Sequence, residues 1–272
     1  MKIISNLHTH STFCDGRNTP EEIVLAAIDK GFSSIGFSSH GYTPYDLRYC
    51  MKDTEGYIAE IRRLKGKYHD KIKILLGIEE DAFAPVNRAD FDYVIGSSHY
   101  YCLGGNYLPI DSSYDYFKAC LVAFNYDAVK MGEIYYSKFC DYIAKRKPDI
   151  IGHFDLITKF DDLDASLFFD NPEYCALAEK YVLKAAESGC LFEVNTGAIT
   201  RGFRTTPYPS THLLHVLKKE SVKLILSSDS HSVDTLDGVF DETAHYLYDL
   251  GFREVYFPSD SGFAPYPLKD LQ

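Results

Sequence analysis

The sequence predicts an α/β protein built as a single barrel, with residues 1–272 in one domain. Three observations predict this fold. Short apolar runs alternate with longer helical patterns, which is typical of parallel strands joined by helical crossovers. The chain length of 272 residues suits one α/β barrel. No repeat, Gly/Ser-rich linker or low-complexity tract divides the chain.

Eight short apolar runs are the candidate strands. They are Ile3–Leu7, Ser34–Phe37, Ile72–Ile78, Tyr93–Ser97, Ile150–Gly152, Leu191–Asn195, Leu224–Ser228 and Val255–Phe257. In α/β barrels the catalytic side chains come from the ends of the strands, at the C-terminal face. Polar residues that directly follow these runs are therefore the candidates for a functional site.

Helices are predicted between several of these runs from the signals at their ends. Thr19 is followed by Pro20, Glu21 and Glu22, which is an N-cap residue, a proline at the first helical position and an acidic first turn; this helix ends at Gly31. Further helices are predicted from Asn171 to Gly189, from Ser210 onward, and from Asp234 or Thr235 toward Gly251.

The composition excludes several classes of protein. Apolar residues make up 46% of the chain and charged residues 25%, which excludes disordered and fibrous proteins. The net charge of -11 disfavours nucleic acid and anionic membranes as partners. No apolar run is long enough to span a membrane or to form a signal-peptide core. Seven cysteines without a C-x-x-C pair indicate reduced thiols, so we expect a cytoplasmic protein. The sequence does not fix the oligomeric state and leaves a homo-oligomer open.

Histidines and carboxylates gather at the ends of the predicted strands. His8 and His10 follow the first strand, and the strand period of two turns both side chains to the same side. The other such residues are Asp15, in the loop after the first strand, His40, Glu79, Glu80, Asp81, His99, His153, Asp229 and His231. Converging imidazoles and carboxylates select divalent ions such as Zn²⁺, Mn²⁺ or Fe²⁺. The sequence therefore predicts a metal site, with too many ligands for one ion.

In this order, these residues resemble the PHP (polymerase and histidinol phosphatase) family of metal-dependent phosphoesterases. The matching pieces are His8-Thr9-His10, Asp15, Ser-Ser-His40, Gly-Ile-Glu79, Ser-Ser-His99, Gly-His153 and Asp229-Ser-His231. The segments VIGSSHY, IIGHFDLITKF and FEVNTGAITRG are similar to the histidinol-phosphatase branch. The resemblance implies a distorted (β/α)7 barrel with a trinuclear metal centre at the C-terminal face of the strands, so one of the eight candidate strands would lie outside the barrel.

The resemblance also implies which residues bind each of two to three Zn, Mn or Fe ions. The first ion would be held by His8, His10, Glu79 and Asp229, the second by Glu79, His99 and His153, and the third by Asp15, His40 and His231. Strand alternation turns Glu80 away from Glu79, which favours Glu79 as the residue shared by two ions. The sequence alone leaves an interchange of these two glutamates open.

Clustered divalent ions would make hydroxide from a bridging water and neutralise phosphoryl oxygens, so we expect in-line attack on a small phosphomonoester without a covalent intermediate. Glu79, Asp229 and His231 are the predicted catalytic residues. Arg201, Lys159 and Arg204 are predicted to hold the phosphate. Asp81, Glu80 and an aromatic residue from 100–118 are candidates to hold the cationic part of the substrate.

The expected activity is that of a histidinol-phosphatase, which releases L-histidinol and phosphate in histidine biosynthesis. An alternative is a related phosphoesterase that acts on a nucleotide, a sugar phosphate or phosphotyrosine. An amidohydrolase-type barrel also opens with H-x-H, but the bridging lysine of that class has no counterpart here. A non-catalytic metal-binding module is a further alternative, which the complete ligand set disfavours.

Overall fold

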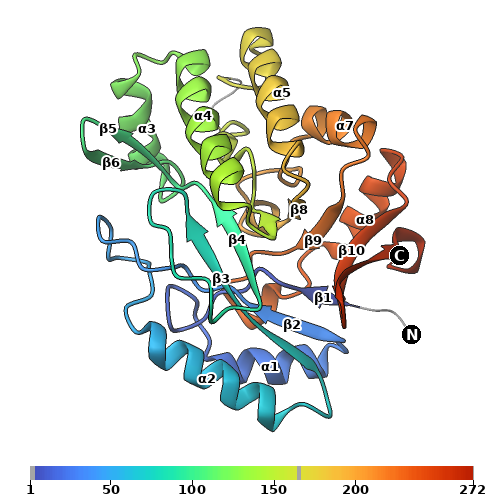
Figure 1. Ribbon diagram of the computed structural model, residues 1–272. Helices are drawn as coiled ribbons and strands as arrows, with labels where there is room; N and C mark the ends of the chain where they lie inside the picture. The colour runs from blue at the N-terminus through green and yellow to red at the C-terminus, as the bar shows by residue number, and fades with distance from the viewer. Residues whose placement is uncertain (1–3, 164–166, 272) are drawn as a thin grey trace.

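A computed structural model describes residues 4–163 and 167–271 of the chain (Figure 1). Its centre is a parallel sheet of seven strands in the order β1-β2-β3-β4-β7-β8-β9. The strands are β1 (Ser5–Asn6), β2 (Ser34–Phe37), β3 (Lys73–Asp81), β4 (Tyr93–Ser97), β7 (Ile150–Ile151), β8 (Leu191–Asn195) and β9 (Leu224–Ser227). Each corresponds to a predicted strand, although Ile3 of the first prediction lies outside the described residues.

The sheet curves into a nearly closed barrel. Beyond the ends of β1 and β9, the amide of His10 donates to the carbonyl of Ser230 at 2.8 Å, and the amide of Ser230 donates to the carbonyl of His8 at 3.0 Å. These bonds bring the first and last strands together at the C-terminal face. The predicted (β/α)7 barrel is therefore confirmed.

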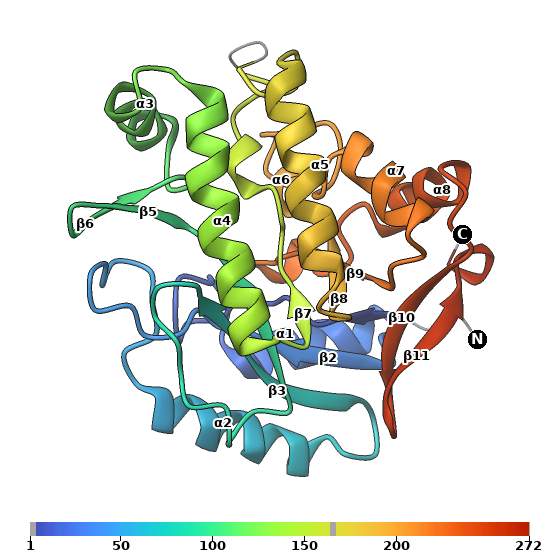
Figure 2. The ribbon, with the colours of Figure 1, turned by 45° about the horizontal axis from the view of Figure 1, so that its top comes forward.

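Helices cover the outside of the barrel, as Figures 1 and 2 show. They are α1 (Pro20–Asp29), α2 (Thr54–Lys67), α3 (Tyr114–Ala123), α4 (Ala128–Arg146), α5 (Pro172–Ala186), α6 (Gly197–Thr200), α7 (Thr211–Lys219) and α8 (Phe240–Asp249). Short 3-10 turns lie at Leu156–Thr158, Val233–Thr235 and Leu268–Asp270. Within the described residues, every helix is too short or too polar to cross a bilayer.

The ends of these helices test the predicted boundaries. Thr19 forms a capping box with Glu22 at the start of α1, and the side chain of Asn171 accepts two backbone N–H groups at the start of α5. The last helix differs from its prediction. A 3-10 turn occupies Val233–Thr235, and α8 begins only at Phe240, so the prediction of a start at Asp234 or Thr235 is wrong.

Two antiparallel hairpins lie outside the barrel. β10 (Glu254–Ser259) contains the predicted strand Val255–Phe257 and pairs with β11 (Gly262–Pro267), so this is the candidate strand that the barrel excludes. β5 (Tyr100–Leu103) pairs with β6 (Asn106–Pro109) directly after the end of β4. The second hairpin was not predicted, and it projects beside the C-terminal face of the barrel (Figure 2).

Tyr93 fills the barrel interior near the N-terminal ends of the strands. Its hydroxyl donates to the carbonyl oxygens of Leu7 and Phe37. Gly36 and Gly77 make room for the ring, because a Cβ atom added at either would lie 2.4 Å or 2.2 Å from a side-chain atom of Tyr93. Tyr93 thus closes the interior near the N-terminal ends of the strands, while the histidines and carboxylates lie at the opposite end.

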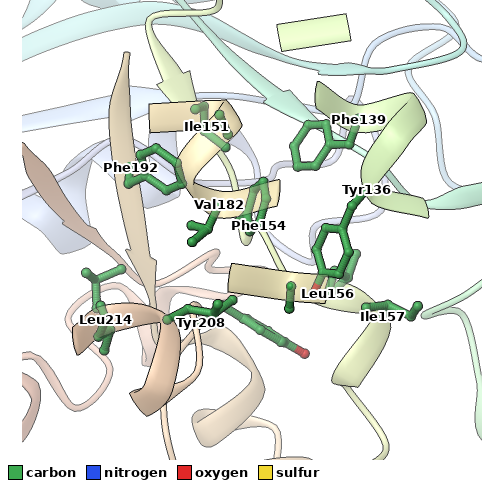
Figure 3. Packing of buried hydrophobic residues seen from close by; sticks show 14 of the residues in the cluster. Tyr136, Phe139, Ile151, Phe154, Leu156, Ile157, Val182, Phe192, Tyr208 and Leu214 are labelled. Atoms are coloured by element: carbon green, nitrogen blue, oxygen red, sulfur yellow. The ribbon is translucent and has the colours of Figure 1, made fainter. Parts of the chain in front are cut away.

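Aromatic packing fixes α4 and α5 against the outer face of the sheet (Figure 3). The ring of Tyr136 on α4 stacks on that of Phe154 at 5.1 Å between centroids, and Phe154 in turn contacts Phe192 of β8 at 5.7 Å. These residues are fully buried. Because His153 precedes Phe154, the same packing anchors the chain at the point where β7 delivers its histidine to the interior.

Candidate metal centre

The strand ends bring all the predicted metal ligands together. β1 is followed by His8 and His10, β2 by His40, β4 by His99, β7 by His153, and β9 by Asp229 and His231, while Glu79 lies within β3 and Asp15 in the loop after β1. Their ligand atoms form four overlapping clusters of three or four, each small enough to surround one ion. The three predicted ligand sets, which draw on these clusters, are called the first, second and third group below. Most of these side chains are almost completely buried.

The first group contains His8, His10, Glu79 and Asp229. Oδ1 of Asp229 lies 3.6 Å from Nε2 of His8 and 3.2 Å from Nε2 of His10. Oε2 of Glu79 lies 3.3 Å and 3.6 Å from the same two nitrogen atoms. This is the ligand set predicted for the first ion.

The second group forms around the other oxygen of Glu79. Oε1 lies 3.3 Å from Nε2 of His99 and 3.0 Å from Nε2 of His153. Because its two oxygens face different histidines, the Glu79 carboxylate has the geometry of a bridge between two ions.

The third group lies toward solvent. Oδ1 of Asp15 is 3.4 Å from Nε2 of His231 and 3.7 Å from Nε2 of His40. Nδ1 of His40 is also 2.8 Å from Oε2 of Glu79. His40 therefore lies between this group and the bridging carboxylate.

The donor set fits divalent transition-metal ions. Within the described part of the chain, Nε2 of His8 and Nε2 of His10 are buried without a hydrogen-bond partner. Buried polar atoms are rarely left unpaired, whereas an imidazole nitrogen that binds a metal needs no other partner. Nitrogen and carboxylate donors in groups of three or four suit zinc, manganese or iron.

The charge states of two of the ligands, His10 and Glu79, also suit metal binding. Burial lowers the pKa of His10 to about 3, with the neighbouring His231 and His40 acting in the same direction. Burial raises the pKa of Glu79, but the surrounding histidines outweigh it and hold that pKa well below its usual range. Neutral imidazole and ionised carboxylate are the forms that bind a metal ion.

Glu80 lies on the other side of the barrel wall. It accepts hydrogen bonds from the hydroxyl of Tyr142 at 2.7 Å, from Arg146 at 2.6 and 3.0 Å and from the amide of Val86 at 2.7 Å. Glu80 is thus fully engaged with α4 and the loop after β3. Of the two glutamates, Glu79 therefore lies among the proposed ligands and Glu80 does not.

A cavity of about 360 Å³ opens above the ligands, and Lys159 and Arg201 line it. Arg201 donates to Oδ2 and to the carbonyl oxygen of Asp229, both at 3.0 Å. Lys159 is buried and donates to the carbonyl oxygen of Asp111 at 2.6 Å. Both cations therefore line the cavity, and Arg201 contacts one of the proposed metal ligands.

Three other predicted substrate contacts lie outside this lining, and one of them, Glu80, faces α4 as described above. Arg204 donates to Oγ1 of Thr158 at 2.9 Å and lies over the ring of Tyr208. Asp81 accepts from the amide of His99 at 3.0 Å and lies 3.1 Å from its Nδ1. The structure thus places Asp81 behind a metal ligand, and contact of Asp81 or Arg204 with the substrate stays a prediction.

Several residues of the site were not predicted. Asp46, Tyr49 and Asp111 line the cavity, together with Tyr100 from the aromatic stretch 100–118. They come from the loop after β2 and from the β5–β6 hairpin and the chain that follows it. Glu193 of β8 contacts His8 from behind. A charged residue inside the apolar strand LFEVN could have indicated that Glu193 is a functional residue. The loop residues show no sequence pattern that would have indicated a role.

Comparisons with known proteins show what this chain is similar to. The family model described as "PHP domain" matches residues 6–197. A protein of Schizosaccharomyces pombe named "Probable histidinol-phosphatase" is 31% identical over 91% of this chain and 87% of its own. The histidinol-phosphatase of Bacillus subtilis is 26% identical, over 82% and 92%. A solved structure of histidinol phosphate phosphatase from Lactococcus lactis, complexed with zinc, L-histidinol and phosphate, superposes with a TM-score of 0.68 at 20% identity, over 96% of this chain and 98% of that one.

Proposed function

The chain belongs to the PHP domain family, and we propose that it is a metal-dependent phosphomonoesterase that hydrolyses L-histidinol phosphate to L-histidinol and phosphate. One observation carries the proposal. Three sets of ligands, two of which share the Glu79 carboxylate, lie at the floor of a cavity whose wall holds Arg201 and Lys159. Metal ligands and cations beside one cavity suit a phosphate ester.

The position of each residue indicates its role in the proposed reaction. When bound, divalent ions at such a site lower the pKa of a water ligand and neutralise phosphoryl charge. Glu79 fixes the spacing of two ligand groups, and Asp229 and His231 hold the side of the site next to Arg201. The Arg201 guanidinium would donate to phosphoryl oxygens, and the buried Lys159 ammonium would add a second positive charge.

The choice of histidinol phosphate rests on two supports. The S. pombe relative that covers most of this chain carries that activity in its name, and the L. lactis protein of the same fold binds L-histidinol and phosphate. The cavity also carries charges of both signs, because Asp46 and Asp111 line it together with the two cations. A substrate with an anionic phosphate and a cationic amine matches such a wall.

Phosphate release over a panel of substrates tests the proposal. The zinc-, manganese- or iron-loaded protein is given histidinol phosphate, a nucleotide, a sugar phosphate and a phosphotyrosine peptide. We expect the highest kcat/KM for histidinol phosphate. Preference for another substrate would overturn the choice of substrate but leave the phosphoesterase in place, whereas no release from any of them would overturn both. The single-domain organisation, the cytoplasmic location and a homo-oligomeric state stay predictions.

A further inference from the structure

β8 differs from the other strands of the barrel. Each of the other six is followed by, or contains, at least one of the proposed metal ligands, and β8 supplies none of them. Alternation along LFEVN turns Glu193 and Asn195 to the same side as Leu191, which belongs to the interior of the barrel. A carboxylate thus enters the interior directly behind the ligands, and the metal groups do not account for it.

We propose that Glu193 is a positioning residue of the metal centre, because its carboxylate holds the Nδ1 proton of His8 and so presents Nε2 of His8 to the metal ion. This inference rests on the metal centre of the proposed function. It concerns a residue that touches neither the ion nor the substrate.

The contact between Glu193 and His8 is short and fully buried. Oε1 of Glu193 lies 2.6 Å from Nδ1 of His8, and both side chains are fully buried. A neutral imidazole carries one proton, and a carboxylate neighbour can only accept, so the proton belongs on Nδ1. Nε2 of His8 then offers its lone pair, 3.3 Å from Oε2 of Glu79 and 3.6 Å from Oδ1 of Asp229.

The carboxylate is itself held in place by three further donors. The Ser227 hydroxyl donates to Oε1 at 2.5 Å, while Oε2 accepts from the amide of His153 at 2.7 Å and from the side chain of Asn195 at 3.0 Å. A buried carboxylate with four partners has little freedom to move. Glu193 therefore fixes a side chain of the first ligand group and the backbone of a residue in the second.

Other ligands have different neighbours behind them. Nδ1 of His99 faces Asp81 at 3.1 Å, whereas Nδ1 of His10 lies 3.5 Å from the sulfur of Cys14 and 3.9 Å from Oδ1 of Asp15. Carboxylates behind metal-bound histidines raise the basicity of the ligand and fix its tautomer. The shortest of these contacts is the one made by Glu193, so its removal should have the clearest effect on metal affinity.

Glu80 provides a matched control, since it is also a fully buried glutamate on a barrel strand but faces the helices. Zinc affinity is measured by competition with a chelating dye for the wild type, Glu193→Gln and Glu80→Gln. We expect Glu193→Gln to weaken the tightest zinc binding about 10–100-fold. Glu80→Gln should leave it within a few-fold although it lowers stability. Equal affinity of Glu193→Gln and wild type would overturn the inference.

A second measurement needs no variant, so a folding failure of Glu193→Gln cannot block the test. In the zinc-loaded wild type with ¹⁵N-labelled histidine, NMR should show His8 bound through Nε2 with a strongly hydrogen-bonded proton on Nδ1. Binding through Nδ1 would overturn the inference. A wild-type protein that binds no zinc would instead overturn the metal centre itself, and failure on the substrate panel would leave the role of Glu193 intact.

Discussion

Glu79 and Glu80 are neighbours in β3, yet their carboxylates lie on opposite faces of the barrel wall. Glu79 is 3.0 Å from Nε2 of His153 in the interior, whereas Glu80 is 2.6 Å from the guanidinium of Arg146 on α4. One step along a strand thus separates a residue of the site from a residue that holds a helix to the barrel. Substitutions at these two positions should therefore have different effects.

Glu79→Gln should reduce phosphate release at least about 100-fold, because it removes the charge shared by two ligand groups. Glu80→Gln should instead lower the free energy of unfolding by about 3 kcal/mol, since it leaves Arg146 without its carboxylate partner. Phosphate release and urea denaturation of both variants check this pair. A strong loss of activity per folded molecule in Glu80→Gln would contradict it.

The stabilisation by Glu80 should depend on pH. Burial raises the pKa of this carboxyl, but hydrogen bonds from Arg146 and Tyr142 outweigh it and hold the pKa below its usual value of 4.5. A lowered pKa in the folded state gives stability that is present above pH 4.5 and is lost as the pH falls toward the folded-state pKa. The difference in unfolding free energy between wild type and Glu80→Gln should therefore shrink in acid. Urea denaturation at neutral pH and below pH ~4, with chelator present in both proteins, measures it.

Metal removal should abolish the activity. We expect the purified protein to carry two to three transition-metal ions per chain, as measured by elemental analysis. Dialysis against a chelator should stop phosphate release, and addition of zinc, manganese or iron should restore it. Full activity in a sample shown to be metal-free would contradict the proposed chemistry.

His153→Ala should remove a ligand of the second group only. The bound metal should fall by about one ion per chain, and phosphate release should fall at least about 100-fold. His245→Ala is the control, because His245 is exposed on α8 and bonds to the carbonyl oxygen of Asp241. A mild effect of His153→Ala would mean that the second ion is placed wrongly.

Arg201→Ala should lower kcat/KM for a phosphomonoester by about 100-fold, because it removes a donor beside the metal ligands. Arg201→Lys should recover part of the loss, since lysine keeps the charge but not the bidentate hydrogen bonds. Unchanged kinetics of Arg201→Ala would remove Arg201 from the site.

Arg204→Ala tests whether Arg204, which lies in the same loop, contacts the phosphate of the substrate. Its guanidinium lies over Tyr208, so we expect lower stability and a smaller kinetic effect.

The ligands were predictable because their positions depend on local periodicity. A histidine or carboxylate at the end of a parallel strand reaches the same face as its neighbours when strand alternation turns it to the interior. The alternation that separates Glu79 from Glu80 has the same local origin.

The cavity wall was not predictable in this way. Asp46 and Asp111 reach the cavity through loops, whose course depends on tertiary packing. Glu193 acquires its role only through contact with His8, 185 positions away in the sequence. Arg201 and Arg204 lie in the same loop of the sequence. However, the short helix α6 ends next to Arg201, which faces Asp229, while Arg204 packs on Tyr208.

The hydrogen bonds between the ends of β1 and β9 join the two extremes of the barrel. Asn6 and Ser228, which also bond to each other, are 222 positions apart. His8, His10 and Asp229 lie on either side of this junction, so an ion bound by all three would cross-link the first strand to the last. Such a link can form only after the last strand has been synthesised. Metal affinity and resistance of the barrel to opening at this junction would then rise and fall together.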